Sequence, residues 1–259
     1  MIDLRGRVLL VTGGGQGIGR QIALQAAQQG AQGVIITDFR SERAEAVAAE
    51  VNAAGSRGLA LQNDVSEFAD VHSTVATAVA HFGRIDILVN NAGNAGPKPT
   101  ATMDLPFWQQ TEEDWHGYLG TNLFGVLNYS HAVSPIMIEN GWGRVVNIIS
   151  DAGRFGEPNR EAYSAAKAGV AGFTRSLAAT LGRHLITANC VAIAATTTPR
   201  TEERFKDEAR MKKMLSNYLI RRPGEPSDVA NMVVFLASEA APWVTGQTIP
   251  VNGGYSFAL

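Results

Sequence analysis

Short apolar runs recur along the whole chain, and alanine-rich segments separate them. Several runs carry apolar, often β-branched residues at consecutive positions, which is typical of strands buried on both faces of a parallel sheet. The segments 20–29, 42–54 and 71–81 between them have the length of helices. The predicted strands are the runs 8–11, 33–37, 59–62, 85–89, 144–149, 187–192 and 248–251.

The alternation of strand and helix predicts an α/β fold. Repeated right-handed crossover units give a doubly wound parallel sheet. The sequence has no Gly/Ser-rich or Pro-rich linker and no repeat of fixed period, so we expect one domain over residues 1–259. Two long loops belong to it: the glycine- and proline-rich segment 93–106, and an irregular segment around 194–222 that we expect to be the substrate loop.

Composition narrows the class of protein. The 259 residues are 45% hydrophobic and 18% charged, which excludes a disordered chain and allows a large core. A net charge of −2 argues against nucleic-acid or membrane-surface partners, and no apolar run approaches the ~18 residues of a membrane span. The single cysteine, Cys190, cannot form an intrachain disulfide and reads as a small buried residue. With no secretory signal at the start of the chain, we expect a cytoplasmic protein.

A glycine-rich turn, Thr12-Gly-Gly-Gly-Gln-Gly-Ile-Gly19, follows the first predicted strand and precedes a helix. Glycines suit a tight turn whose backbone must approach a pyrophosphate closely, and the helix amino terminus offers unpaired N–H groups and partial positive charge. This context predicts a dinucleotide site. Its candidate cofactor-binding residues in the turn are Gly13, Gln16, Gly17, Ile18 and Gly19.

Asp38 ends the second predicted strand, nineteen residues beyond Gly19. An acid there accepts hydrogen bonds from the adenosine ribose and repels a 2′-phosphate, which favours NAD over NADP. Gln16 brings no positive charge for a 2′-phosphate either, whereas the nearby Arg40 weakens the preference. The alternative role for Asp38 is an ordinary strand-end or helix-capping acid.

Tyr163 and Lys167 are four residues apart, so on a helix they share one face. A free tyrosine has a pKa of about 10, too high for a base near neutrality. A lysine cation beside it stabilises the phenolate and lowers that pKa. We therefore predict that Tyr163 is a general acid and base. A core tyrosine beside a solvated lysine is the alternative.

Four motifs in order resemble the short-chain dehydrogenase/reductase family. They are the turn 12–19, Asn90-Asn91-Ala92-Gly93, Tyr163-Ser-Ala-Ala-Lys167, and Trp243-Val-Thr-Gly-Gln247 followed by Val251-Asn-Gly-Gly254. The resemblance covers essentially the whole chain. It implies a Rossmann-like sheet in three layers, a homotetramer, and NAD-dependent hydride transfer between a secondary alcohol and a ketone.

The resemblance also implies roles for individual residues. Ser150, thirteen residues before Tyr163, would hydrogen-bond the substrate oxygen, and Asn122 would hold a water that leads protons from Lys167 to solvent. Lys167 would also hold the nicotinamide ribose, as Tyr163 and Lys167 are both cofactor contacts in the family. A strand-end cap and a helix-bending polar group are the alternative roles of Ser150 and Asn122. The other implied cofactor contacts are Phe39, Asp64, Val65, Asn91, Ala92, Gly93, Thr196 and Thr198.

The chain departs from the family after the sixth predicted strand. Ile193-Ala194 stands where the family usually has Pro-Gly, which frees one φ angle and adds a Cβ. The departure weakens the assignment of Thr196 and Thr198 as contacts of the nicotinamide carboxamide. It predicts a reshaped wall between cofactor and substrate.

The substrate stays open at this point. Arg154, Arg160 and the segment 200–222, with eight basic and four acidic side chains, suit an anionic substrate such as a 3-hydroxyacyl or alicyclic thioester of coenzyme A. A solvated, mixed-charge helix is the favoured interpretation of those charges, and an uncharged cyclic or steroid-like alcohol is the alternative substrate.

The alternative function from another class of protein is a non-catalytic redox sensor that binds the dinucleotide. Such a sensor would lack some of the catalytic residues, but all four are present here: Asn122, Ser150, Tyr163 and Lys167. The five histidines show no metal-ligand spacing, so we expect no metal. The apolar end 255–259 suits a subunit contact or packing on its own chain.

Overall fold

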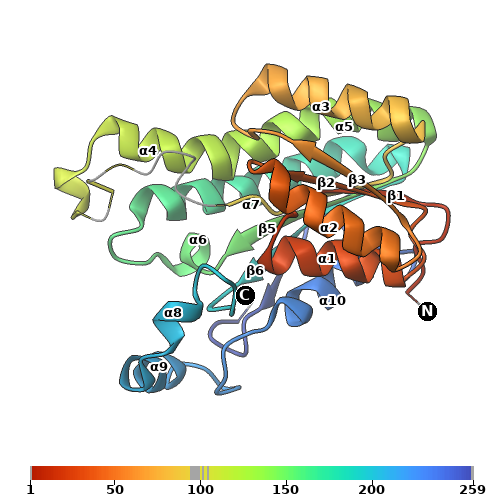
Figure 1. Cartoon of the computed structure of the whole chain (residues 1–259). Helices are drawn as coiled ribbons and strands as arrows, with labels where there is room; N and C mark the ends of the chain where they lie inside the picture. Colours follow the sequence, from red (N-terminus) through yellow and green to blue (C-terminus); the bar gives the residue numbers. More distant parts are fainter. Residues whose placement is uncertain (1, 94–99, 101, 104, 258–259) are drawn as a thin grey trace.

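The computed structural model describes residues 2–93, 100, 102–103 and 105–257, and its centre is one seven-stranded parallel sheet (Figure 1). The strand order is β3-β2-β1-β4-β5-β6-β7, so the direction of winding reverses between β1 and β4. All seven predicted strands are confirmed, each within two residues of the expected bounds. The strands are β1 Val8–Thr12, β2 Gly33–Asp38, β3 Arg57–Gln62, β4 Ile87–Asn90, β5 Gly143–Ser150, β6 Ile186–Ile193 and β7 Thr248–Val251.

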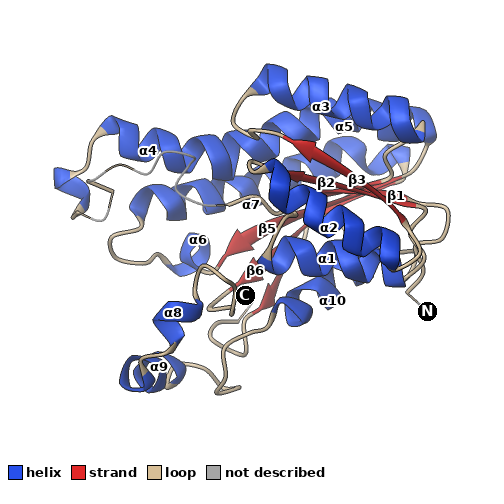
Figure 2. Ribbon diagram, in the orientation of Figure 1, coloured by secondary structure: helices blue, strands red, loops and turns tan. Residues whose placement is uncertain are grey.

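Helices cover both faces of the sheet, which confirms the three-layer, Rossmann-like prediction (Figure 2). Alternate strand residues divide between the two cores: Leu9 and Val11 of β1 pack with α1, α2 and α10, whereas Val8 and Leu10 pack with α3, α5 and α7. The helices are α1 Gly17–Gln28, α2 Ser41–Ala53, α3 Phe68–Phe82, α4 Glu112–Leu119, α5 Gly125–Asn140, α6 Ala152–Phe155, α7 Glu161–Leu181, α8 Glu202–Phe205, α9 Glu208–Leu215 and α10 Pro226–Ala237.

The first expected loop is described only in part, whereas the second is described and contains helices. In 93–106, residues 94–99, 101 and 104 lie outside the described residues. The segment 194–222 is less irregular than predicted, because it contains the short helices α8 and α9, which project from the body of the molecule (Figure 1). Across the described part of the chain, no helix is long and apolar enough to cross a membrane.

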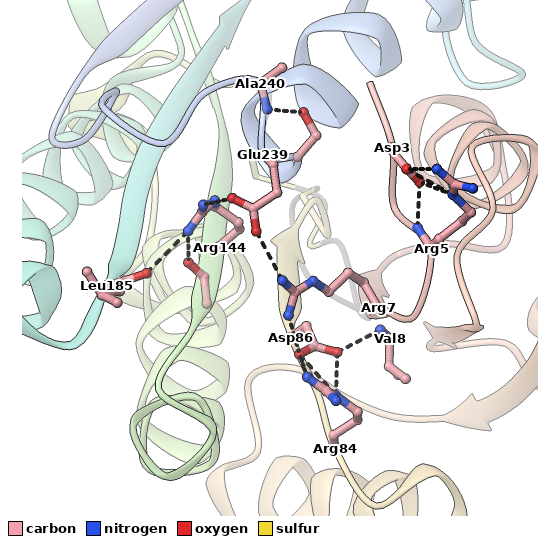
Figure 3. A network of polar contacts seen from close by, with 12 residues as sticks. Asp3, Arg5, Arg7, Val8, Arg84, Asp86, Arg144, Leu185, Glu239 and Ala240 are labelled. Atoms are coloured by element: carbon pink, nitrogen blue, oxygen red, sulfur yellow. Dashed lines mark hydrogen bonds and ion pairs between the residues drawn. The ribbon is translucent and has the colours of Figure 1, made fainter. Parts of the chain in front are cut away.

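A polar network ties the starts of the strands together at the edge opposite the glycine-rich turn (Figure 3). The buried Asp86 carboxylate accepts the Val8 N–H at 2.8 Å and pairs with Arg84 at 2.5 Å. The Arg144 N–H donates to the Asp86 carbonyl at 3.0 Å. Asp86 therefore fastens β1, β4 and β5 at their amino ends.

We expect Asp86→Ala to lower the free energy of unfolding by about 2–4 kcal/mol, because it leaves the buried Val8 N–H and the Arg84 guanidinium without their acceptor. Urea denaturation measures the change. The matched control is Asp3→Ala, whose carboxylate pairs with the exposed Arg5 and should leave the urea midpoint unchanged. An equal effect of the two substitutions would contradict the role given to Asp86.

Candidate active site

A cavity of about 720 Å³ opens at the carboxyl edge of the sheet, beside the reversal between β1 and β4. Ligands of doubly wound sheets bind at this position, and the volume suits a cofactor with substrate. The cavity is lined by most of the residues that the sequence predicted. These are Gly13, Gln16, Gly17, Ile18, Asp38, Phe39, Asp64, Val65, Asn91, Ala92, Gly93, Tyr163, Lys167 and Thr198.

The glycine-rich turn delivers the amino terminus of α1 to this cavity. Gly13 and Gly17 have φ angles of +59° and +55°, which only glycine adopts without strain. The first turn of α1 contains no acidic residue, and its N-cap residue, Gln16, makes no side-chain capping bond. The positive end of the helix dipole is therefore not neutralised by the helix itself, which fits a pyrophosphate.

Hydrogen bonds lock the turn to the loop after β4. The Asn91 carboxamide donates to the carbonyls of Thr12 and Gly13, both at 3.0 Å, and the Thr12 hydroxyl accepts the N–H groups of Asn91 and Ala92. Gly19 does not line the cavity; a Cβ there would lie 2.6 Å from the Asn91 carboxamide nitrogen. The absence of a side chain at Gly19 thus allows α1 to pack closely against the Asn91 carboxamide.

Asp38 caps neighbouring backbone groups, which is the alternative role given to it, and it also lines the cavity. Its carboxylate lines the cavity and also accepts the N–H groups of Gly15 at 3.0 Å and Arg40 at 3.1 Å. Each carboxylate oxygen keeps further acceptor capacity for a ribose hydroxyl. Arg40 and Arg43 line the same end, and the sequence patterns did not indicate Arg43.

The adjoining wall follows β3. The Asp64 carboxylate accepts the N–H and hydroxyl of Ser66 at 3.0 and 2.7 Å, and the Val65 carbonyl accepts the Asn128 carboxamide at 3.0 Å. Phe39 is half exposed beside them. These contacts hold Asp64 and Val65 in place in the wall of the cavity.

Tyr163 and Lys167 lie on one face of α7, as predicted. The buried Lys167 ammonium donates to the Ile148 carbonyl at 2.9 Å and lies 5.8 Å from the centre of the Tyr163 ring. Burial lowers the pKa of Lys167 to about 8, because a desolvated ammonium loses its proton more readily.

The proton affinity of Tyr163 differs from the expectation. Burial raises the pKa of Tyr163, and the Arg160 cation and a hydrogen bond from Ser150 act in the opposite direction. The Arg160 guanidinium carbon lies 4.6 Å from the centre of the tyrosine ring. The Arg160 guanidinium thus lies nearer to the centre of the Tyr163 ring than the Lys167 ammonium, which is buried and donates to the Ile148 carbonyl.

Asn122 lies in a π-helical turn, Gly120–Phe124, between α4 and α5. Its carboxamide donates to the Tyr118 carbonyl at 2.9 Å. A Cβ on Gly93 would lie 3.0 Å from the Asn122 carboxamide oxygen and 3.3 Å from the Lys167 nitrogen. Asn122 does not line the cavity, but Gly93 lies between its carboxamide and the Lys167 ammonium. π-Turns inside helices are frequent at functional sites.

The segment after β6 is held by its own hydrogen bonds. The Thr196 hydroxyl donates to the Ala194 carbonyl at 3.1 Å, and the Tyr218 hydroxyl accepts the Ala195 N–H at 3.1 Å. Thr196 is buried outside the cavity lining, whereas Thr198 lines the cavity and packs on Gly17. The structure therefore separates these two threonines.

Arg154 does not line the cavity, and its guanidinium is held by other residues of the chain. Its guanidinium donates to Asp151 and Ser256 at 2.7 Å and to the Phe257 carbonyl at 2.6 Å. Asn252 donates to the other Asp151 oxygen at 2.6 Å. Arg154 thus fastens residues up to 257 onto their own chain, and residues 258–259 of the apolar end lie outside the described residues.

The described residues contain no group of three or more His, Cys, Asp and Glu side chains able to hold a metal. Cys190 is buried, as expected, and donates to the Thr174 hydroxyl at 3.1 Å. Arg200 and Met103 line the cavity as well. Arg200 was one of many charges in its segment, and no sequence signal distinguished it.

Comparisons with known proteins agree with this geometry. The family model described as enoyl-(acyl carrier protein) reductase matches residues 13–256. A 3-oxoacyl-[acyl-carrier-protein] reductase of Staphylococcus epidermidis is 39% identical over 248 residues, covering 95% of this chain and 97% of the relative. The (2S)-[(R)-hydroxy(phenyl)methyl]succinyl-CoA dehydrogenase subunit BbsD of Thauera aromatica is 42% identical over 255 residues, 98% of each chain.

Solved structures match almost the whole chain as well. A putative short-chain alcohol dehydrogenase from Sinorhizobium meliloti superposes with a TM-score of 0.90 at 35% identity, over 98% of each chain. A 7α-hydroxysteroid dehydrogenase complexed with NADH and 7-oxo glycochenodeoxycholic acid has a TM-score of 0.89 at 34% identity, over 98% of this chain and 95% of its own. The chain therefore belongs to the short-chain dehydrogenase/reductase family, whose members are oxidoreductases acting on alcohol and keto groups.

Proposed function

We propose that this protein is an NAD-dependent oxidoreductase that interconverts a secondary alcohol and a ketone, with Tyr163 as general acid and base. One observation carries the proposal. Tyr163, hydrogen-bonded to Ser150, and the buried Lys167 share a cavity with the glycine-rich turn and Asp38. A proton donor and a site suited to a dinucleotide thus line the same cavity.

The chain's own residues handle the substrate oxygen and its proton. In reduction the Tyr163 hydroxyl gives its proton to the carbonyl oxygen; in oxidation the phenolate takes it back. The Ser150 oxygen accepts the Ala152 N–H at 3.2 Å, and the hydroxyl hydrogen that Ser150 donates to Tyr163 would turn to the substrate oxygen and stabilise it. Lys167 lies beside Tyr163 and Gly93, and with Asn122 it would return the proton from solvent.

The residues of the cavity fit a nicotinamide dinucleotide, which supplies or accepts the hydride when bound. The amino terminus of α1 would hold the pyrophosphate, and Asp38 the adenosine ribose. Asp64 and Val65 would border the adenine, and residues 91–93 would form the floor. Thr198, which reaches Gly17, is better placed than Thr196 for the carboxamide.

Two substrate classes suit the site. A 3-hydroxyacyl or alicyclic acyl thioester is supported by relatives named for acyl-carrier-protein and coenzyme A substrates. An uncharged cyclic or steroid-like alcohol is favoured by a different observation. α9 buries none of its residues, and Lys206 pairs with Glu203 at 2.6 Å in the open, so most charges of 200–222 form a solvated face.

We expect Tyr163→Phe to lower kcat by about 10²–10⁴-fold, because the ring stays while the proton donor is lost. Spectrophotometric NADH oxidation with a 3-oxoacyl thioester and a cyclic ketone measures turnover. Quenching of protein fluorescence by NADH checks that the cofactor still binds. Tyr255→Phe, at a tyrosine outside the cavity lining, is the control. Turnover that survives in Tyr163→Phe with NADH bound would remove Tyr163 from its role.

Burial lowers the pKa of Lys167 from 10.5 to about 8, so between these values the folded protein binds fewer protons than the unfolded chain. Stability supplied by this group should therefore rise with pH across that window. We expect the stability difference between wild type and Lys167→Met to move in favour of wild type from about pH 8 to about pH 10. Urea unfolding of both proteins measures it, and a constant difference would contradict the burial of the charge.

Asp38→Asn keeps the side-chain shape and removes the charge that repels a 2′-phosphate, while Arg40 and Arg43 remain. We expect the preference for NADH over NADPH, measured as the ratio of kcat/KM values, to fall by about tenfold. Glu42→Gln removes an exposed charge nearby that does not line the cavity, and should leave the ratio unchanged. Equal ratios in wild type and Asp38→Asn would oppose the assignment of NAD.

A further inference from the structure

We propose that Arg200 recognises a carboxylate of the substrate close to the carbon that is oxidised or reduced. This inference rests on the proposed function and narrows its substrate class to oxo acids and hydroxy acids, free or as half-thioesters that keep one carboxylate. The support comes from how Arg200 is held, where its head group lies, and which charges around it are already paired.

A fixed turn presents Arg200 to the cavity. The Thr201 N–H donates to the Thr198 carbonyl at 2.9 Å, and the Thr201 hydroxyl donates to the Thr196 carbonyl at 2.7 Å. Pro199 occupies the second position of this turn, where its fixed φ angle is favourable. Arg200 therefore projects from a braced backbone rather than from a free loop end.

The head group of Arg200 lies at the reaction end of the cavity. Its guanidinium donates to the Gly93 carbonyl at 3.3 Å, and Gly93 is the position where an added Cβ would meet both Lys167 and Asn122. Burial raises the pKa of Tyr163, and the charge of Arg200 is among the effects that oppose this rise. A substrate whose oxygen meets Tyr163 would place its nearest substituents within reach of this guanidinium.

The acids around Tyr163 are already paired with other cations. Glu157 pairs with Arg160 at 2.6 Å, and Asp151 pairs with Arg154 at 2.7 Å. Within the described part of the chain, Arg200 has no carboxylate within ion-pair distance. One bond to a carbonyl leaves most of its five N–H donors for a planar, bidentate acceptor, and a carboxylate matches that geometry.

The position favours a carboxylate over the phosphates of a carrier. In a coenzyme A thioester the whole pantetheine arm separates the phosphates from the reacting acyl group, whereas Arg200 lines the same cavity as Tyr163 and binds the Gly93 carbonyl. Other basic residues of the segment have different surroundings: Lys206 pairs with Glu203 in solvent, and Arg222 pairs with Asp228 at 2.7 Å. Arg200 alone of the segment's basic residues lines this cavity among the residues described.

The test compares matched substrates in Arg200→Gln, Arg200→Lys and the control Arg221→Gln, which removes an exposed charge of the same segment outside the cavity lining. The first pair is 3-oxocyclohexanecarboxylate and its methyl ester, which differ in the charge. The second pair is acetoacetyl-coenzyme A and acetoacetyl-pantetheine, which differ in the phosphates and the adenosine that carries them. NADH oxidation gives kcat/KM for each.

We expect Arg200→Gln to lower kcat/KM for the oxo acid by about tenfold or more, and to change the ester by less than about threefold. Arg200→Lys should recover part of the loss, and Arg221→Gln should behave as wild type. An equal loss for acid and ester would overturn the proposal. The role of Arg200 would then be to hold the loop after β4 through its hydrogen bond to the Gly93 carbonyl. A selective loss for the coenzyme A thioester would overturn it in favour of phosphate recognition.

Calorimetric titration of the oxo acid into the protein with NADH separates this inference from the proposed function. A wild type that turns over none of the four compounds would defeat the proposed function. Binding of the oxo acid that is about tenfold weaker in Arg200→Gln would still support the carboxylate site. Equal binding by wild type and Arg200→Gln, or none by either, would overturn it.

Discussion

The candidate active site depends on the hydrogen bonds that join the loop after β1 to the loop after β4. Thr12 and Asn91 exchange donors and acceptors across the point where the strand order reverses. The two loops are thereby one rigid unit: the glycine-rich turn faces the cavity on one side, and Gly93 reaches Lys167 and Asn122 on the other. The glycine-rich turn and the surroundings of Lys167 are therefore positioned by the same contacts.

Burial and local charge set the chemistry of the two groups on α7. The Lys167 ammonium has left water for a backbone carbonyl, which brings its pKa down to about 8. Burial raises the pKa of the Tyr163 phenol instead, because the charged form of a phenol is the deprotonated one. Proton affinity is therefore a property of the assembled cavity, to which Arg160, Ser150 and Arg200 contribute from three different segments.

Three arginines that look alike in the sequence have three different environments. The Arg154 guanidinium binds the carboxy-terminal segment through Ser256. The Arg160 guanidinium pairs with Glu157 and lies over the Tyr163 ring. Arg200 lines the cavity with spare donors. The difference comes from packing partners distant in the chain, such as Ser256 for Arg154 and Gly93 for Arg200, so charge counting within a segment could not separate them.

The sequence by itself determined the seven strands, the parallel sheet and the family, because buried parallel strands and glycine-rich turns leave local signals. It also identified most cavity residues, since their spacing follows from strand ends and from one turn of helix. Only the tertiary structure decided that Thr196 lies outside the cavity, that Arg154 binds the carboxy-terminal segment, and that Arg160 lies nearer to the Tyr163 ring than Lys167. Those outcomes depend on burial and on contacts between distant segments, which no local pattern encodes.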